Sequence, residues 1–190
     1  MLNESHRAEI QRLWARKVQQ DSANVPFAER HRNLAPVSAE FLSALVSGIG
    51  ARKIVEIGGS SGISTIALAA AAQQTQGKLI SLEIEATRQA ESKETIGKLG
   101  LRNFVDFRLG DAAQILPHLN DIEFVLIDCE KQDYIRFFDM LRLRPGGVVV
   151  ADNILSHHLT DYVAHVRSHR GAASVTLPIG QGLELTRVAE

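Results

Sequence analysis

The sequence predicts an α/β fold built on a doubly wound, mostly parallel sheet of seven strands with an antiparallel C-terminal hairpin strand. From residue 53 onward, short apolar segments alternate with segments of helical length, as in parallel sheets covered by helices on both faces. The apolar segments are continuous runs of Val, Ile and Leu, as strands buried on both faces require. Residues 173–188 read as two strands joined by a turn at 180–182.

The chain has 190 residues, of which 45% are hydrophobic and 23% are charged, a balance typical of a single globular domain. We expect residues 1–36 to form an amphipathic helix and a loop, followed by the main domain at 37–190. The helix is expected at residues 4–20, where one stripe carries Ile10, Leu13, Trp14 and Val18. We expect this stripe to pack on the domain; a dimer contact or a cover over an active site are the alternatives.

The remaining elements follow in a regular order. Ser38 is expected to be the N-cap of a helix that runs to about Gly48. Parallel strands are expected at residues 53–58, 78–85, 104–109, 123–128 and 147–152. Helices are expected at residues 62–74, 111–119, 131–142 and 157–169. A further helix is expected to follow the strand 78–85 and to end at about residue 99. This arrangement is Rossmann-like.

Charge and composition limit the partners. The net charge is −1 and the isoelectric point is about 6.7, so bulk charge indicates neither a nucleic acid nor an anionic membrane as partner. No apolar run is long enough for a transmembrane helix, and the first residues contain no apolar signal core. The single cysteine, Cys129, excludes a disulfide within the chain. We therefore expect a cytoplasmic protein.

Acidic residues follow the carboxyl end of every predicted parallel strand. In open α/β sheets this edge binds ligands, near the point where the strand order reverses. The position of these residues therefore predicts a polar site at one edge of the sheet, although each acid alone could be a helix cap. Asp111 is the residue best placed to act as one. The strand-end residues are Glu56 with Gly58, Glu83, Asp111, Asp128, and Asp152 with Asn153.

The first strand leads into the glycine-rich loop EIGGSSGIS at residues 56–64. Gly58 and Gly62 permit close approach by a ligand, and the helix that follows presents free N–H groups to it. Glu83 comes 21 residues after Gly62, a spacing that places an acid beside ribose hydroxyls. Loop and acid together indicate a cofactor that contains adenosine.

The same loop also matches the nucleophile motif G-x-S-x-G of α/β-hydrolases, with Ser60 as the nucleophile. Asp152 and His157 or His158 would follow in the required order. However, the acid and the histidine would be only five or six residues apart, and Glu83 and Asp111 would have no role. A hydrolase is therefore disfavoured.

Taken together, the motifs resemble those of class I methyltransferases that use S-adenosylmethionine (SAM), and more narrowly the cation-dependent O-methyltransferases of the caffeoyl-CoA and catechol type. The resemblance covers about residues 36–188. It rests on VEIGGSSGIS, LISLEIE, GDAAQILP, IDCEKQDY, RPGGVVVADN and LPIGQGLEL. It implies SAM as cofactor, a small hydroxyl-bearing acceptor such as a phenol or catechol as substrate, and a possible homodimer.

The resemblance also implies a role for each matching residue. The methionine part of SAM would be held by Glu56, Gly58, Gly62 and Ser64. Glu83 would bind the ribose, and Asp111 with Ala112 would face the adenine. A divalent cation, usually magnesium, would be held by Asp128, Asp152 and Asn153, whose oxygen atoms suit a hard cation. Lys131 matches the catalytic lysine, with Asp128 beside it, while Tyr134 is expected to pack in the core.

Three features depart from the family pattern. The chain passes quickly from Asn153 to the last hairpin, without the usual insertion that walls the acceptor site, and this shortening predicts a more open site. Cys129 and Glu130 replace a small or aromatic pair, and we expect Cys129 to pack near the cofactor rather than to react. Gln181 stands where many relatives have an aspartate.

Other functions stay open from the sequence. One is a metal-independent methyltransferase for an amine or a carboxylate, in which a histidine such as His157 could act as the base. An NAD(P)-dependent oxidoreductase would share the glycine loop and Glu83, but the acids after the fourth and fifth strands argue against it. A SAM-binding protein without catalysis would not need Lys131. The pair His165 and His169 has metal-ligand spacing, but a solvated helix face is the preferred interpretation.

Overall fold

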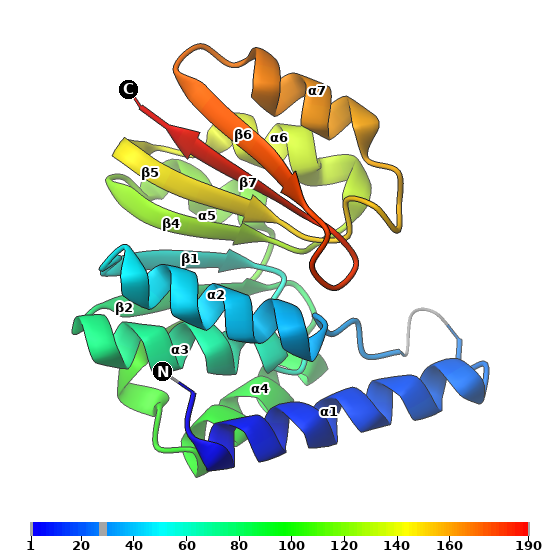
Figure 1. Ribbon diagram of the computed structural model, residues 1–190. Helices are drawn as coiled ribbons and strands as arrows, with labels where there is room; N and C mark the ends of the chain where they lie inside the picture. Colours follow the sequence, from blue (N-terminus) through cyan, green and yellow to red (C-terminus); the bar gives the residue numbers. More distant parts are fainter. Residues whose placement is uncertain (1, 27–29, 190) are drawn as a thin grey trace.

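The computed structural model describes residues 2–26 and 30–189. It contains one seven-stranded sheet in the order β3-β2-β1-β4-β5-β7-β6 (Figure 1). The strands are β1 (Lys53–Ile57), β2 (Lys78–Glu83), β3 (Val105–Leu109), β4 (Ile122–Ile127), β5 (Leu143–Ala151), β6 (Ala172–Leu177) and β7 (Leu183–Val188). Strands β1 to β5 pair in parallel, and β7 is antiparallel to both β5 and β6. The predicted fold class and the closing hairpin are confirmed.

Helices cover both faces of the sheet (Figure 1). They are α1 (Glu4–Ser22), α2 (Pro36–Gly48), α3 (Ile63–Thr75), α4 (Ala86–Lys98), α5 (Ala112–Ile115), α6 (Tyr134–Met140) and α7 (Thr160–Ser168). Helices α1 to α4 contribute to the apolar layer on one face, and α5 to α7 to the layer on the other. None of the helices in the described residues is long and apolar enough to cross a membrane.

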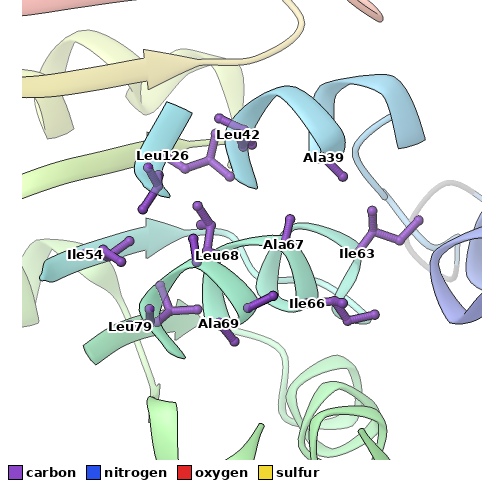
Figure 2. Close-up of a cluster of buried hydrophobic side chains, with 14 of the residues drawn as sticks. Ala39, Leu42, Ile54, Ile63, Ile66, Ala67, Leu68, Ala69, Leu79 and Leu126 are labelled. Carbon is purple, nitrogen blue, oxygen red and sulfur yellow. The ribbon is translucent and has the colours of Figure 1, made fainter. Parts of the chain in front are cut away.

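Alternate residues of each central strand enter opposite layers of the core. Ile54 of β1 faces the layer beneath α2 and α3, whereas its neighbour Val55 faces α5 and α6. This alternation follows from the two-residue period of a strand and explains why the strand sequences are apolar throughout. Figure 2 shows the first layer, in which Leu42 of α2 and Leu68 of α3 lie between the sheet and the helices.

Helix α3 is buried from Ile63 to Ala72. Its alanines are small, so α2 can pack closely on it while its other side contacts the sheet (Figure 2). The consequence for function is positional: α3 begins directly after the glycine loop of β1, and its N-terminus is held rigidly at the carboxyl edge of the sheet.

The N-terminal helix α1 packs against α3 and α2, as expected. It begins with a capping box, in which the Asn3 side chain accepts a hydrogen bond from the backbone N–H of His6 at 2.9 Å. Ile10 and Leu13 are buried, but Val18 is 45% exposed. The predicted apolar stripe is therefore correct in the first half of the helix and wrong at Val18, beyond which the helix no longer lies on the core.

Several predicted boundaries differ from the structure, and three of them have a clear physical reason. Ser38 is not an N-cap, because α2 begins at Pro36 with Ala35 as its cap; the fixed φ of proline suits the first helical position. Strand β5 begins at Leu143 rather than near residue 147, since Leu143 already pairs with Ile122. Helix α7 begins at Thr160 rather than at residue 157, because His158 has a left-handed φ of 51° that interrupts the helix.

The layered core gives a direct stability prediction. Leu68 is fully buried, so Leu68→Ala is expected to lower the free energy of unfolding by about 2–5 kcal/mol through lost contacts and a residual cavity. Val37→Ala is the control, because Val37 is 56% exposed and such surface changes stay within about 0.5 kcal/mol. Urea unfolding of both variants measures the difference, and equal losses would contradict the packing described.

Candidate functional site

A cavity of about 480 Å³ lies at the carboxyl edge of the sheet. Every parallel strand contributes to it through the loop that follows the strand or through its last residue. The contributions, in chain order, are Gly58 and Ser60, Glu83, Asp111 and Ala112, Asp128 and Lys131, and Asn153. The cavity thus lies at the carboxyl edge of the sheet, where the sequence predicted a polar site.

Four of the predicted site residues do not line the cavity. They are Glu56, Gly62, Ser64 and Asp152, and each is buried. Glu56 lies under the glycine loop, where its Oε2 accepts hydrogen bonds from Thr65 Oγ1 at 2.8 Å and Ser81 Oγ at 2.6 Å. Burial raises the pKa of the Glu56 carboxyl. The geometry makes Glu56 a support of the loop, because its side chain points into packed protein.

Two glycines of the loop are required by close packing. A Cβ atom at Gly58 would lie 2.2 Å from the carbonyl oxygen of Asp128. A Cβ atom at Gly62 would lie 2.9 Å from Ser92 Oγ on α4. Both residues also have positive φ angles, of 96° and 112°. Gly58 therefore lets the loop after β1 contact the loop after β4, whereas Gly62 seats the start of α3 against α4.

Glu83 is held rigidly at the end of β2. It is 7% exposed. Its Oε2 accepts a hydrogen bond from the backbone N–H of Ser60 at 2.8 Å, and its Oε1 accepts from those of Ile84 and Glu85 at 2.9 Å each. Three backbone donors fix the carboxylate and leave acceptor capacity on Oε2, since an ionised carboxylate offers about four acceptor positions. This group can accept a hydrogen bond from a ligand hydroxyl in the cavity.

Asp111 lines the cavity beside the Glu83 strand end and is also the N-cap of α5. Its side chain accepts a hydrogen bond from the backbone N–H of Ala113 at 2.8 Å. The expectation that Asp111 acts as a helix cap is confirmed. Its neighbour Ala112 also lines the cavity, and its side chain is a methyl group, which suits contact with a flat aromatic ligand.

Lys131 is placed by two hydrogen bonds on the 3₁₀ turn Lys131–Asp133. Its Nζ donates to Asp128 Oδ1 at 3.2 Å and to Tyr134 Oη at 2.7 Å. Tyr134 is fully buried, as expected, and its hydroxyl donates in turn to the backbone carbonyl of Asp152 at 3.2 Å. These two contacts hold the Lys131 Nζ atom in one position beside Asp128.

Asp128 and Asp152 follow the neighbouring strands β4 and β5; Asp152 is buried, and the side chain of Asp128 is 8% exposed. Burial raises the pKa of Asp128. Burial, followed by the negative charge of Asp128, raises the pKa of Asp152 to about 8. The Oδ1 atom of Asp152 is buried without a hydrogen-bond partner among the residues that the structure describes. Lys131 alone cannot neutralise two buried carboxylates.

This pair of carboxylates, together with Asn153, fits a hard divalent cation. Such cations prefer carboxylate and amide oxygens, and a cation would satisfy the unpaired Asp152 oxygen and offset the repulsion between the acids. Across residues 2–26 and 30–189 there is no group of three or more His, Cys, Asp and Glu side chains that could hold a metal ion. A site here would therefore depend on Asn153 as its third protein ligand.

The chain matches a family model described as O-methyltransferase over residues 7–187. This match spans nearly all of the chain. The protein belongs to the O-methyltransferase family.

Two curated relatives illustrate the match. The chain is 35% identical over 130 residues to a catechol O-methyltransferase of Niastella koreensis, and the alignment covers 65% of the chain and 58% of the relative. It is 32% identical over 135 residues to caffeoyl-CoA O-methyltransferase 2 of Zea mays, and this alignment covers 65% of the chain and 51% of the relative. The chain thus aligns with only about half the length of these relatives.

Solved structures share the fold. An O-methyltransferase from Bacillus cereus in complex with SAH has a TM-score of 0.80 at 23% identity, and the similarity covers 99% of this chain and 92% of that one. An SAH-bound methyltransferase from Podospora anserina has a TM-score of 0.84 at 16% identity and covers 100% of this chain and 89% of that one. The order and direction of the strands are those of an O-methyltransferase fold.

One wall of the cavity in this O-methyltransferase family member was missed by the sequence analysis. The end of α1 and the segment 30–33 contribute Lys17, Asp21, Arg30, His31, Arg32 and Asn33. Arg32 forms an ion pair with Glu130, beside Lys131, and Asn33 Oδ1 accepts a hydrogen bond from Ser61 Oγ at 3.0 Å. The segment has no hydrophobic period, and only its density of polar side chains before Pro36 could have indicated a role.

The N-terminal wall is anchored to α4. His31 Nε2 lies 2.9 Å from Glu91 Oε2, and Arg16 pairs with the same carboxylate at 2.5 Å. Burial lowers the pKa of His31. Helix α1 thus packs on the domain and also borders the cavity, so two of the interpretations considered for it apply together.

The remaining candidates have structural explanations. Ser60 Oγ is buried without a hydrogen-bond partner in the described part of the chain, so no histidine activates it, in agreement with the sequence, which disfavoured a hydrolase. Cys129 lines the cavity, and burial raises the pKa of its thiol, which disfavours a reactive thiolate. His165 pairs with Asp139 at 2.6 Å rather than with His169. His157 does border the cavity, and burial lowers its pKa.

The carboxylate pair predicts a pH-dependent stability. Asp152 has an ordinary pKa of 3.8 and a folded pKa of about 8, so the folded protein binds one more proton than the unfolded chain between these values, and stability falls as pH rises through this range. Asp152→Asn carries no such proton. In protein treated with EDTA, the thermal stability of this variant relative to wild type is expected to increase from about pH 4 to pH 8 and then level off.

Thermal unfolding at several pH values measures this difference. Asp121→Asn is the control, because Asp121 is exposed in a turn, and its difference from wild type should not change with pH in this way. The raised pKa of Asp152 would be contradicted if the stability of Asp152→Asn relative to wild type did not change with pH.

Proposed function

We propose that this protein is a SAM-dependent O-methyltransferase that methylates a small hydroxyl-bearing acceptor, phenolic or catechol-like, with the assistance of a divalent cation such as magnesium. The observation that carries the proposal is that Lys131, Asp128 and the fixed carboxylate of Glu83 line one cavity, with Asp152 buried behind Asn153 at its edge. Family membership supports it, as do relatives named catechol and caffeoyl-CoA O-methyltransferases.

In this proposal the first half of the cavity binds the cofactor. SAM supplies an electrophilic methyl group. Glu83 accepts a hydrogen bond from the ribose, and Ala112 and Asp111 border the adenine. Gly58 allows the methionine part to lie close to the backbone. Glu56, Gly62 and Ser64 are buried and stabilise the conformation of the loop without contacting the cofactor.

The second half of the cavity prepares the acceptor. Asp128, Asp152 and Asn153 would hold the cation, which lowers the pKa of a bound hydroxyl and orients it. Lys131 Nζ, held by Asp128 and Tyr134, accepts the hydroxyl proton on its lone pair. The walls of the cavity hold donor and acceptor in one orientation, from which much of the rate gain arises.

The alternatives differ in what they require. A metal-independent methyltransferase for an amine or a carboxylate would bind SAM and be active with a chelator present, with His157 as a possible base. An NAD(P)-dependent oxidoreductase would bind a nicotinamide cofactor instead of SAM. A SAM-binding protein without catalysis would bind SAM and transfer no methyl group. We further propose a cytoplasmic location and a homodimer. Light scattering on the purified chain would test the homodimer.

Cofactor binding is the first test. Calorimetric titration is expected to show SAM binding to the wild type, and Glu83→Gln is expected to weaken it about 10- to 100-fold, because a hydrogen bond to a charged group contributes about 1.5–3 kcal/mol. Glu85→Gln is the matched control, since Glu85 is exposed two residues away. No SAM binding by the wild type would refute the proposal and favour the oxidoreductase.

Turnover with a catechol is the second test, followed by mass spectrometry of the methyl ether. EDTA and Asp152→Ala are each expected to abolish most of the activity. Lys131→Met is expected to lower turnover by about 10²- to 10⁴-fold, the usual contribution of a general base, with SAM affinity unchanged. Lys98→Met is the control, because Lys98 is an exposed lysine on α4.

Two results would redirect the proposal. Full activity in EDTA would support the metal-independent alternative. SAM binding without methylation of any hydroxyl, amine or carboxylate acceptor would support the non-catalytic one.

A further inference from the structure

The turn between β6 and β7 folds against the segment that follows β5 (Figure 1). The backbone carbonyl of Gln181 accepts hydrogen bonds from the N–H groups of Leu155 at 3.1 Å and Ser156 at 3.2 Å, and that of Gly182 accepts from Ile154 at 3.0 Å. A Cβ atom at Gly182 would lie 2.7 Å from the backbone nitrogen of Leu155. The two segments are therefore held in one relative position by their backbones alone.

Within this contact, the Gln181 side chain reaches Asn153. Asn153 Nδ2 donates to Gln181 Oε1 at 3.2 Å and to Asp152 Oδ2 at 2.7 Å. Ser156 Oγ also donates to Gln181 Oε1, at 3.3 Å. Gln181 and Asn153 both line the cavity, so this bond lies at the site and not behind it.

The two bonds from Asn153 have a consequence for its remaining polar atom. An amide NH₂ group has two hydrogens, and both are used, one by an acid and one by Gln181. The acceptor oxygen Oδ1 is then the polar atom of the side chain that is left for a ligand. With only the Asp152 bond, the amide could turn about that single contact; the second acceptor fixes its plane.

The backbone of Asn153 is in an unusual conformation. Its φ is 65°, in the left-handed region, which asparagine tolerates better than most residues. Gln181, 28 residues along the chain, accepts a hydrogen bond from the side chain that this backbone carries.

We propose that Gln181 is a positioning residue, which fixes the Asn153 amide so that Oδ1 is presented to the cation. The inference rests on the proposed cation site. Gln181 is neutral, so it fixes the ligand without adding a third negative charge to the buried pair Asp128 and Asp152. The energetic effect acts through Asn153, as for other residues that orient metal ligands.

The test measures Mn²⁺ binding without SAM or acceptor, by the loss of the electron paramagnetic resonance signal of free Mn²⁺. Gln181→Met removes the acceptor at similar size and is expected to weaken Mn²⁺ binding about 10-fold, the lower end for residues that orient metal ligands. Gln181→Glu keeps an acceptor oxygen and is expected to bind Mn²⁺ at least as tightly as wild type. Gln74→Met, at an exposed position of α3, is the control.

The outcomes separate this inference from the proposed function. Weak binding in Gln181→Met with retained binding in Gln181→Glu, at equal thermal stability, supports the inference. Wild-type affinity in Gln181→Met, or an equal loss in both variants, overturns it and leaves the cation site in place. No Mn²⁺ binding by the wild type overturns both this inference and the proposed cation, whereas SAM binding tests the rest of the function separately.

Discussion

The parallel pairing of β1 with β4 is the constraint on which the site depends. These strands are neighbours in the sheet although β2 and β3 lie between them in the chain. Ile57 pairs with Ile127, so the residues that follow, Gly58 and Asp128, lie against each other. The absence of a side chain at Gly58 makes this contact possible. The cavity therefore spans the point where the strand order reverses.

The same arrangement gathers acidic residues, of which Asp128 and Asp152 repel each other. Parallel strands all end at one edge, so Glu83, Asp128 and Asp152 come together there, and the last two are buried with raised pKa values. The apolar layers on the two faces of the sheet hold the strand ends in place despite this repulsion. Local conflict of this kind, inside an otherwise consistent fold, is characteristic of a functional site.

The N-terminal region completes the cavity from the opposite side. Its contribution rests on ion pairs and hydrogen bonds that bridge distant parts of the chain, from Arg16 and His31 to Glu91 and from Arg32 to Glu130. Residues 30–33 all line the cavity together with the strand ends. The cavity is therefore lined by the strand ends of the sheet and by residues of the N-terminal region.

Sequence alone determined the sheet, its direction and the residues at its carboxyl edge, because continuous apolar strands and their spacing are local features with a strong period. It also placed Glu83, Asp128, Lys131 and Asn153 in one site. Only the tertiary structure decided that Glu56 lies beneath the loop and that Gln181 contacts Asn153. It alone decided that residues 30–33 border the cavity. These contacts join residues far apart in the chain and follow no period, so packing between elements, and not local pattern, sets them.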